Sequence, residues 1–289
     1  MVPFLPRIER AIEAALAPLD AADAPPLLRK ALRHAVFPGG ARFRPRLCLA
    51  VAMACGDPDP DLADRAAVAV ELLHCASLVH DDLPCFDDSP LRRGRPSVHA
   101  AFGEPLGVLA GDALIVQAFG VLASPAGGVG DRLPALIGII ARAAGAPHGI
   151  AAGQAWESEP HPNLSAYHKA KTAALFVAAV EAGACAAGHA HQPWRLLGEC
   201  LGEAYQIGDD LRDAVSSEAV LGKPVGRDQA LMRPSAVATH GVAGAIRHLR
   251  ALIERASASI PDLPAAPTLR ALIEAEASRF VPKELLQAA

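Results

Sequence analysis

The chain has 289 residues, of which 52% are hydrophobic and only 4% are aromatic. That length supplies a substantial apolar core, and the many Ala, Leu and Val residues favour closely packed helices over sheets. A formal net charge of −4 excludes the strongly basic surface that nucleic acid or an acidic membrane attracts, so we expect no nucleic-acid partner.

Apolar residues recur at helical spacing along nearly the whole chain, and no segment shows the alternation of a half-buried strand. The predicted helices cover 7–17, 27–36, 46–55, 62–80, 106–123, 132–146, 164–187, 194–213, 241–258 and 267–285. The Gly- and Pro-rich breaks between them are too short to be interdomain linkers, and no internal repeat is visible. We therefore predict one all-α domain over residues 1–289, a bundle of roughly ten or more helices.

The cysteines and the absence of a leader favour a cytoplasmic protein. The six cysteines show no CxxC spacing, and most lie in apolar helical stretches, so we interpret them as reduced core residues. The N-terminus lacks the apolar segment of a signal peptide. The charge-free stretch 113–130 contains Gln117, Pro125 and several glycines, which make a poor spanning helix, so we expect no membrane span.

The predicted helix 62–80 ends in an acidic cluster, Asp81-Asp82-Leu83-Pro84-Cys85-Phe86-Asp87-Asp88. Because residues 66–79 are almost all apolar, these carboxylates would lie at the mouth of an apolar bundle. Asp81 and Asp87 are six residues apart, which on an ideal helix would place them about 120° apart. A loop at Pro84 is therefore needed to bring both to one metal site.

Several cations near Gly-rich or acidic segments are candidate phosphate ligands. Arg92 and Arg93 follow the acidic cluster directly, and their guanidinium groups could bind diphosphate in a bidentate fashion, although surface ion pairs would give the same pattern. His74, seven residues before Asp81, shares its helix face, as a buried core histidine also could. Further candidates are Arg42, Arg44, Lys169, Lys171, Thr172 and Lys223.

A second acidic cluster, Asp209-Asp210-Leu211-Arg212-Asp213, occurs on the predicted helix 194–213. Asp209 and Asp213 are offset by only about 40° around the helix, and Gln206 joins their face. A solvated helix end would have this spacing too, but crowded carboxylates repel unless cations lie among them. Mg²⁺ shared with a phosphate group suits such ligands, so the two clusters predict two walls of one diphosphate site.

With these segments in this order, the chain resembles the trans-polyprenyl diphosphate synthases, and among them the geranylgeranyl diphosphate synthases of bacterial carotenoid and bacteriochlorophyll pathways. The resemblance implies the isoprenoid synthase fold, with helices around a central cavity, and a homodimer. It implies three Mg²⁺ ions held by Asp81, Asp82, Asp87, Asp209, Asp210 and Asp213. It also implies contacts to the allylic substrate from Arg92, Lys171, Thr172, Gln206 and Lys223, and a pocket for isopentenyl diphosphate formed by Arg44, His74 and Arg93.

The activity that the resemblance implies is condensation of isopentenyl diphosphate with an allylic diphosphate, farnesyl diphosphate, to give geranylgeranyl diphosphate. The residues it implies in catalysis are Asp81, Asp82, Asp87, Arg92, Lys171, Asp209 and Lys223. Farnesyl-producing relatives tend to carry an aromatic residue where this chain has Ala76, and Ala76 and Ser77 would leave room for a longer tail. Small residues also serve close helix packing, which is the alternative interpretation.

The chain departs from the family pattern in two places, and other functions stay open. Ala41 stands where the family usually has Lys, and Arg233-Pro234-Ser235 stands where it usually has Lys-Ser-Thr. The alternatives are a farnesyl diphosphate synthase and a non-catalytic subunit of a prenyl synthase. A class I terpene cyclase shares the fold but normally has Asn, Ser or Thr with Glu in its second metal motif, unlike Asp209 to Asp213.

Overall fold

The computed structural model describes residues 4–124, 131–161, 163–215 and 236–281, which are mostly helical. The longer helices are α1 (Phe4–Leu16), α2 (Pro26–Val36), α3 (Phe43–Ala54), α4 (Pro60–Asp81), α6 (Glu104–Ala123), α7 (Arg132–Ala144), α10 (Ala174–Ala186), α11 (Arg195–Val215), α14 (Ala236–Ala258) and α15 (Ala266–Ala277). The short elements are η1 (Ala17–Asp20), α5 (Val98–Phe102), α8 (Ile150–Ala155), η2 (Trp156–Ser158), α9 (Leu164–His168), η3 (Lys169–Ala173) and η4 (Gln192–Trp194). One antiparallel hairpin joins β1 (Leu91–Arg92) to β2 (Arg95–Pro96).

The all-α prediction is confirmed, and each predicted helical segment contains a helix. Most boundaries differ by a few residues, and two segments differ in other ways. The segment predicted over 164–187 is interrupted by η3, a π-helical turn, and α15 ends at Ala277 rather than continuing to 285. The short helices α5 and α8 and the hairpin were not predicted, because they are too short to show a periodicity of their own.

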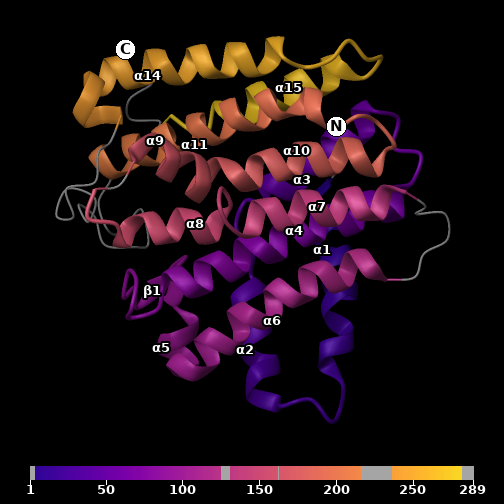
Figure 1. The fold of residues 1–289 in the computed structure, drawn as a ribbon, viewed down its shortest axis with the longest axis vertical. Coiled ribbons are helices and arrows are strands. Elements are labelled where there is room, and N and C mark those ends of the chain that lie inside the picture. The colour runs from indigo at the N-terminus through magenta and orange to yellow at the C-terminus, as the bar shows by residue number, and fades with distance from the viewer. Residues whose placement is uncertain (1–3, 125–130, 162, 216–235, 282–289) are drawn as a thin grey trace.

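Helices α4 and α10 form the centre of the bundle (Figure 1). Around α4 lie α1, α2, α3, α6, α7 and α10, and most of its residues are buried. Almost every residue of α10 is buried as well, and α10 contacts α3, α7 and α11. Their many alanines leave the backbones free to approach closely. The apolar interior is thus built on two helices, and the polar site forms where α4 ends and where α10 begins.

Helix α6 is the one described element that is long and apolar enough to cross a membrane by length and composition. A core helix of a soluble protein meets the same criterion. Only 39% of its apolar window is buried inside the bundle, and Val108, Leu109 and Val116 are exposed on its surface. The rest of the described chain therefore covers only part of the apolar surface of α6.

Candidate active site

The loop after α4 folds back onto the end of the helix. The backbone N–H of Asp87 donates to the carbonyl of Asp81 at 2.9 Å, and that of Ser89 donates to the carbonyl of Asp82 at 3.1 Å. As a result, carboxylate oxygens of Asp81, Asp87 and Glu157 lie within 4.8 Å of one another. The prediction that a loop at Pro84 brings Asp81 and Asp87 together is confirmed.

Glu157, in η2, is a site residue that the sequence analysis missed. Its Oε1 accepts hydrogen bonds from Lys171 Nζ at 2.5 Å and from the hydroxyl of Tyr167 at 2.6 Å, and its Oε2 accepts one from Gln154 at 3.2 Å. A single Glu outside any acidic cluster has no distinctive sequence pattern. Only the fold of α8, η2 and η3 brings it to the carboxylates of the first cluster.

Lys171 and Thr172 connect the two acidic clusters. Lys171 Nζ lies 3.1 Å from Asp81 Oδ1, while the hydroxyl of Thr172 donates to Gln206 Oε1 at 2.8 Å. Gln206 in turn donates to Asp210 Oδ1 at 3.1 Å. Adjacent residues of one π-helical turn therefore reach both walls, and π-helical turns are often found at functional sites.

The position of this turn depends on a close backbone approach at Gly153 in α8. A Cβ atom there would lie only 2.4 Å from the backbone nitrogen of Lys171. Any side chain at this position would force η3 away from α8, so glycine is required for the observed packing. The sequence of α8 thereby sets the place of Lys171 at the acidic cluster.

Burial controls the charges in the first cluster. It raises the pKa of Asp81, and the neighbouring Lys171 only partly opposes this effect. Burial by itself would lower the pKa of Lys171. The carboxylates of Asp81 and Glu157 outweigh this effect and raise the pKa of Lys171 above its ordinary value. Three carboxylates therefore surround one ammonium group: those of Asp81, Asp87 and Glu157. Carboxylate oxygens are ligands that Mg²⁺ prefers, so this set of donors fits Mg²⁺.

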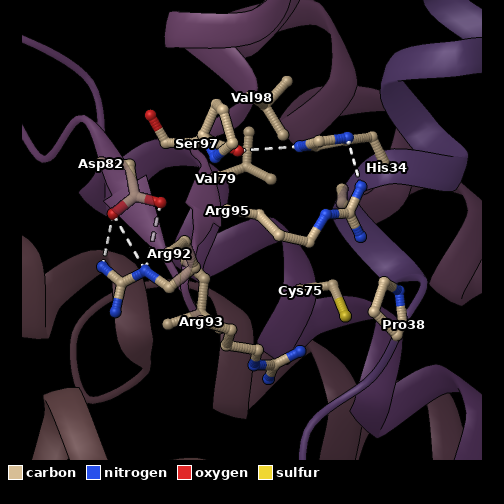
Figure 2. A pocket seen from close by; sticks show the side chains of 13 residues that line it. His34, Pro38, Cys75, Val79, Asp82, Arg92, Arg93, Arg95, Ser97 and Val98 are labelled. Atoms are coloured by element: carbon tan, nitrogen blue, oxygen red, sulfur yellow. Dashed lines mark hydrogen bonds and ion pairs between the residues drawn. The ribbon is translucent and has the colours of Figure 1, made fainter. Parts of the chain in front are cut away.

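Asp82 is not part of that group of three carboxylates and pairs with Arg92. Arg92 Nε lies 3.0 and 3.1 Å from the two carboxylate oxygens of Asp82, and its Nη2 also contacts Asp82 (Figure 2). The same Nη2 is 3.8 Å from Asp81 Oδ2. Asp82 is buried, and burial raises its pKa although the Arg92 pair opposes the rise. Its role as a metal ligand stays a prediction.

The second acidic cluster lies on the last turns of α11. Asp209 pairs with Arg212, and its side chain is 36% exposed. Asp210 is buried and accepts the backbone N–H of Ala236 at 2.7 Å through its other oxygen. Asp213 is partly buried one turn further along the helix. Lys223, predicted to contact the allylic substrate, and the 233–235 segment lie outside the described residues.

The side chains predicted to bind isopentenyl diphosphate are two arginines, Arg44 and Arg93, and His74, whose neutral form is favoured by burial. Arg44, buried in the first turn of α3, lies 4.5 Å from the ring centroid of Phe176, and its Nε has no hydrogen-bond partner. Burial lowers the pKa of Arg44 and also that of His74, where the charges of Arg44 and Arg93 add to the effect. The three predicted side chains therefore lie within electrostatic reach of one another. An anion bound among them would stabilise their charged forms.

Ala76 and Ser77, predicted to set the product length, lie on the last turns of α4. Ala76 is fully buried, and the hydroxyl of Ser77 donates to the carbonyl of His74 at 2.8 Å. A larger side chain at Ala76 would need space now taken by its neighbours or by the cavity that the resemblance implies. Their role in chain length stays a prediction.

Comparison with known proteins gives one consistent family. Residues 25–268 match the model of the polyprenyl synthetase family. The chain is 52% identical to a geranylgeranyl diphosphate synthase of Cereibacter sphaeroides, with 98% of each chain covered, and 38% identical to a farnesyl diphosphate synthase of Geobacillus stearothermophilus, covering 88% and 89%. A Helicobacter pylori geranyltransferase structure, complexed with magnesium and isoprenyl diphosphate, is similar with a TM-score of 0.78 and 28% identity, covering 96% of this chain and 98% of that one.

Proposed function

Because this chain belongs to the polyprenyl synthetase family, we propose that it is a magnesium-dependent trans-prenyltransferase that condenses isopentenyl diphosphate with an allylic diphosphate. Its product is geranylgeranyl diphosphate, made from farnesyl diphosphate. The identity of 52% over 98% of the chain to a geranylgeranyl diphosphate synthase supports this product.

One observation carries the proposal for the site: Lys171 and Thr172, neighbours in η3, connect the first acidic cluster to the second. Lys171 contacts Asp81, and Thr172 reaches Asp210 through Gln206. Two clusters that are connected in this way can bind the same diphosphate through Mg²⁺ ions. Those ions would offset the repulsion among the many carboxylates in this small volume.

The proposed metal ligands are the aspartates of both clusters, with Glu157 beside them. The six aspartates would hold three Mg²⁺ ions: Asp81, Asp82, Asp87, Asp209, Asp210 and Asp213. When bound, Mg²⁺ supplies positive charge to the diphosphate that leaves the allylic substrate. Lys171 and Arg92, which already lie against the first cluster, add fixed positive charge on the same side.

The remaining side chains hold the second substrate and keep water out. Arg44, His74 and Arg93 would bind the diphosphate of isopentenyl diphosphate, whose alkene attacks the allylic cation after the C–O bond breaks. The new carbocation then loses a proton, with the departed diphosphate as the proposed base, and the double bond of the product forms. A cation of this kind is quenched by water, and the buried apolar residues of α4 and α10 provide a dry interior. The carbon chain would extend along α4 past Ser77 and Ala76.

We further propose a single domain that forms a homodimer in the cytoplasm. Three exposed apolar residues make α6 suitable for a helix-on-helix interface: Val108, Leu109 and Val116. Such an interface would also account for the high hydropathy of α6 without a membrane span. All six cysteines are free of disulfides, five of them buried, which suits a reducing compartment.

The experiment that tests the proposed function is diphosphate release by the purified protein. With farnesyl and isopentenyl diphosphates together we expect sustained release, strongly reduced when either substrate is omitted and abolished by a chelator of divalent cations. Readdition of Mg²⁺ should restore it. No release from folded protein under these conditions would refute catalysis and favour a non-catalytic subunit.

A further inference from the structure

The hairpin that carries Arg92 and Arg93 is tied to α2 by two side chains outside the proposed binding residues. Arg95, on β2, reaches across with Nη2 at 2.7 Å from Nδ1 of His34 on α2 (Figure 2). His34 Nε2 lies 2.8 Å from the carbonyl oxygen of Pro96, the residue after Arg95. The two residues are 61 positions apart in the sequence, so this pairing exists only in the folded chain.

The contacts determine which tautomer His34 adopts. An arginine guanidinium can only donate hydrogen bonds, so His34 Nδ1 must accept from Arg95. Nε2 then carries the proton and donates to the carbonyl of Pro96. The His34 ring also packs edge-on against Phe102, with ring centroids 5.3 Å apart. Both ring nitrogens thus bind β2 to α2, and the ring itself packs α2 against α5.

The same guanidinium also holds the loop that leads into the cationic pocket. Arg95 Nη1 donates to the carbonyl of Phe37 at 2.7 Å, at the start of the loop 37–42. At the end of that loop, Arg42 is fixed by Glu71 at 2.7 Å and by Glu9 at 2.8 Å. The loop is therefore held at both ends, once by the hairpin and once by α1 and α4.

Between these two anchors, Arg93 lies directly over the backbone of Gly40. A Cβ atom at Gly40 would lie 3.0 Å from Arg93 Cζ, so glycine leaves room for the guanidinium there. Arg93 and Gly94 form the hairpin turn with φ values of 55° and 73°, the conformation of a tight two-residue turn. The position of Arg93 over the loop therefore depends on how the hairpin is attached to α2. Arg95 and His34 make that attachment.

We propose that His34 and Arg95 are positioning residues that set Arg93 of the hairpin against the loop leading to Arg44, and so give the pocket for isopentenyl diphosphate its shape. This inference rests on the proposed function. Neither residue needs to touch substrate. Their effect should fall on the diphosphate bound by Arg44, His74 and Arg93, because Arg92, the hairpin residue proposed to contact the allylic diphosphate, is held separately by Asp82.

The test compares four variants in steady-state kinetics with both substrates. His34→Leu removes both ring contacts, whereas His34→Asn keeps an oxygen near the position of Nδ1 that can accept from Arg95. Arg95→Lys keeps the charge but cannot reach His34 and Phe37 together. Lys30→Ala, at an exposed position one turn earlier on α2, is the control.

We expect His34→Leu and Arg95→Lys each to raise the KM for isopentenyl diphosphate by about tenfold, the loss of roughly one well-placed hydrogen bond to a charged group. The KM for farnesyl diphosphate and kcat should stay within about twofold, and His34→Asn should recover most of the loss. Calorimetric titration of isopentenyl diphosphate onto protein saturated with Mg²⁺ and farnesyl thiolodiphosphate, an analogue that does not ionise, should show the same order of affinities.

Unchanged affinity for isopentenyl diphosphate in folded His34→Leu and Arg95→Lys proteins would overturn the inference. So would an equal rise in the KM of both substrates, because that pattern indicates general loosening of the hairpin. Thermal melting of each variant establishes that it is folded. Failure of the proposed function would appear separately, as absence of turnover in the unmodified protein.

Discussion

At the scale of single residues, the site is organised by the pairing of cations with carboxylates. Lys171 lies between Asp81 and Glu157, and Arg92 donates hydrogen bonds to both carboxylate oxygens of Asp82. These ammonium and guanidinium groups offset the cost of burying several carboxylates close together. They also leave a fixed positive charge beside the place where a diphosphate would bind.

Glu157→Gln removes the charge that holds Lys171 while keeping the size of the side chain. We expect kcat/KM for the allylic diphosphate to fall by about tenfold or more, because a hydrogen bond between two charged groups is replaced by one from the ammonium group to a neutral amide oxygen. Steady-state kinetics at saturating Mg²⁺ measures the change. Glu159→Gln, at an exposed position two residues away, is the matched control, and equal activity of the two variants would argue against a role for Glu157.

Ala41→Lys would restore a cation that the family usually carries. Ala41 is exposed next to Gly40, over which Arg93 lies, so a lysine there could reach the same diphosphate as Arg93. We expect the KM for isopentenyl diphosphate to fall about threefold to tenfold with little change in kcat, since a contact made equally in the ground and transition states mainly adds binding. An unchanged KM would mean that another cation already supplies this contact.

At the scale of elements, the sequence predicts the helices and loops that local residue patterns determine. It does not predict the contacts between segments that are distant in the sequence. The helix 62–80 and its terminal Asp81 follow from apolar periodicity, and the loop at Pro84 follows from helix geometry. The cation assignments come from family resemblance. Glu157 was missed because its place depends on how α8, η2 and η3 pack. The His34–Arg95 pair was missed because it joins α2 to a hairpin too short to show a strand pattern.

The last turns of α4 are the element that should set product length. Five residues before Asp81, Ala76 lies about 7.5 Å from Asp81 along the helix axis. We predict that Ala76→Tyr shifts the main product from geranylgeranyl to farnesyl diphosphate, when assayed with geranyl and isopentenyl diphosphates, because the ring would occupy space needed by the longer tail. Chromatography of the dephosphorylated products decides the matter. Unchanged twenty-carbon output from a folded, active variant would mean that the tail does not pass Ala76.

At the scale of the whole molecule, four of the eight exposed large apolar side chains among the described residues lie on the contacting helices α6 and α7. Val116 is 70% exposed and Leu109 51% exposed on α6, and Ile137 is exposed on α7, which contacts α6. Single exposed apolar residues are common on protein surfaces, but several along one helix indicate an interface. The proposed site residues lie on other elements, although the first half of α6 packs against the end of α4, where His80 lies 3.2 Å from the carbonyl oxygen of Val108.

Val116→Asp should disrupt the proposed dimer by placing a charge in an apolar interface. Sedimentation velocity should give twice 29.9 kDa for the unmodified protein and 29.9 kDa for the variant. Leu5→Asp, at a 49% exposed position on α1, is the control and should stay dimeric. A monomeric unmodified protein, or a variant that remains a dimer, would contradict the assignment of α6 as the interface.

The central claim is that two acidic clusters act together on one diphosphate to make a twenty-carbon product. Its most direct test measures turnover and product length for the unmodified protein, Asp81→Ala and Asp209→Ala, with farnesyl and isopentenyl diphosphates and saturating Mg²⁺. The account predicts geranylgeranyl diphosphate from the unmodified protein and a loss of turnover of at least about 100-fold in each variant, with no loss of thermal stability, since repulsion between carboxylates is relieved. Near-normal turnover in either variant would contradict it.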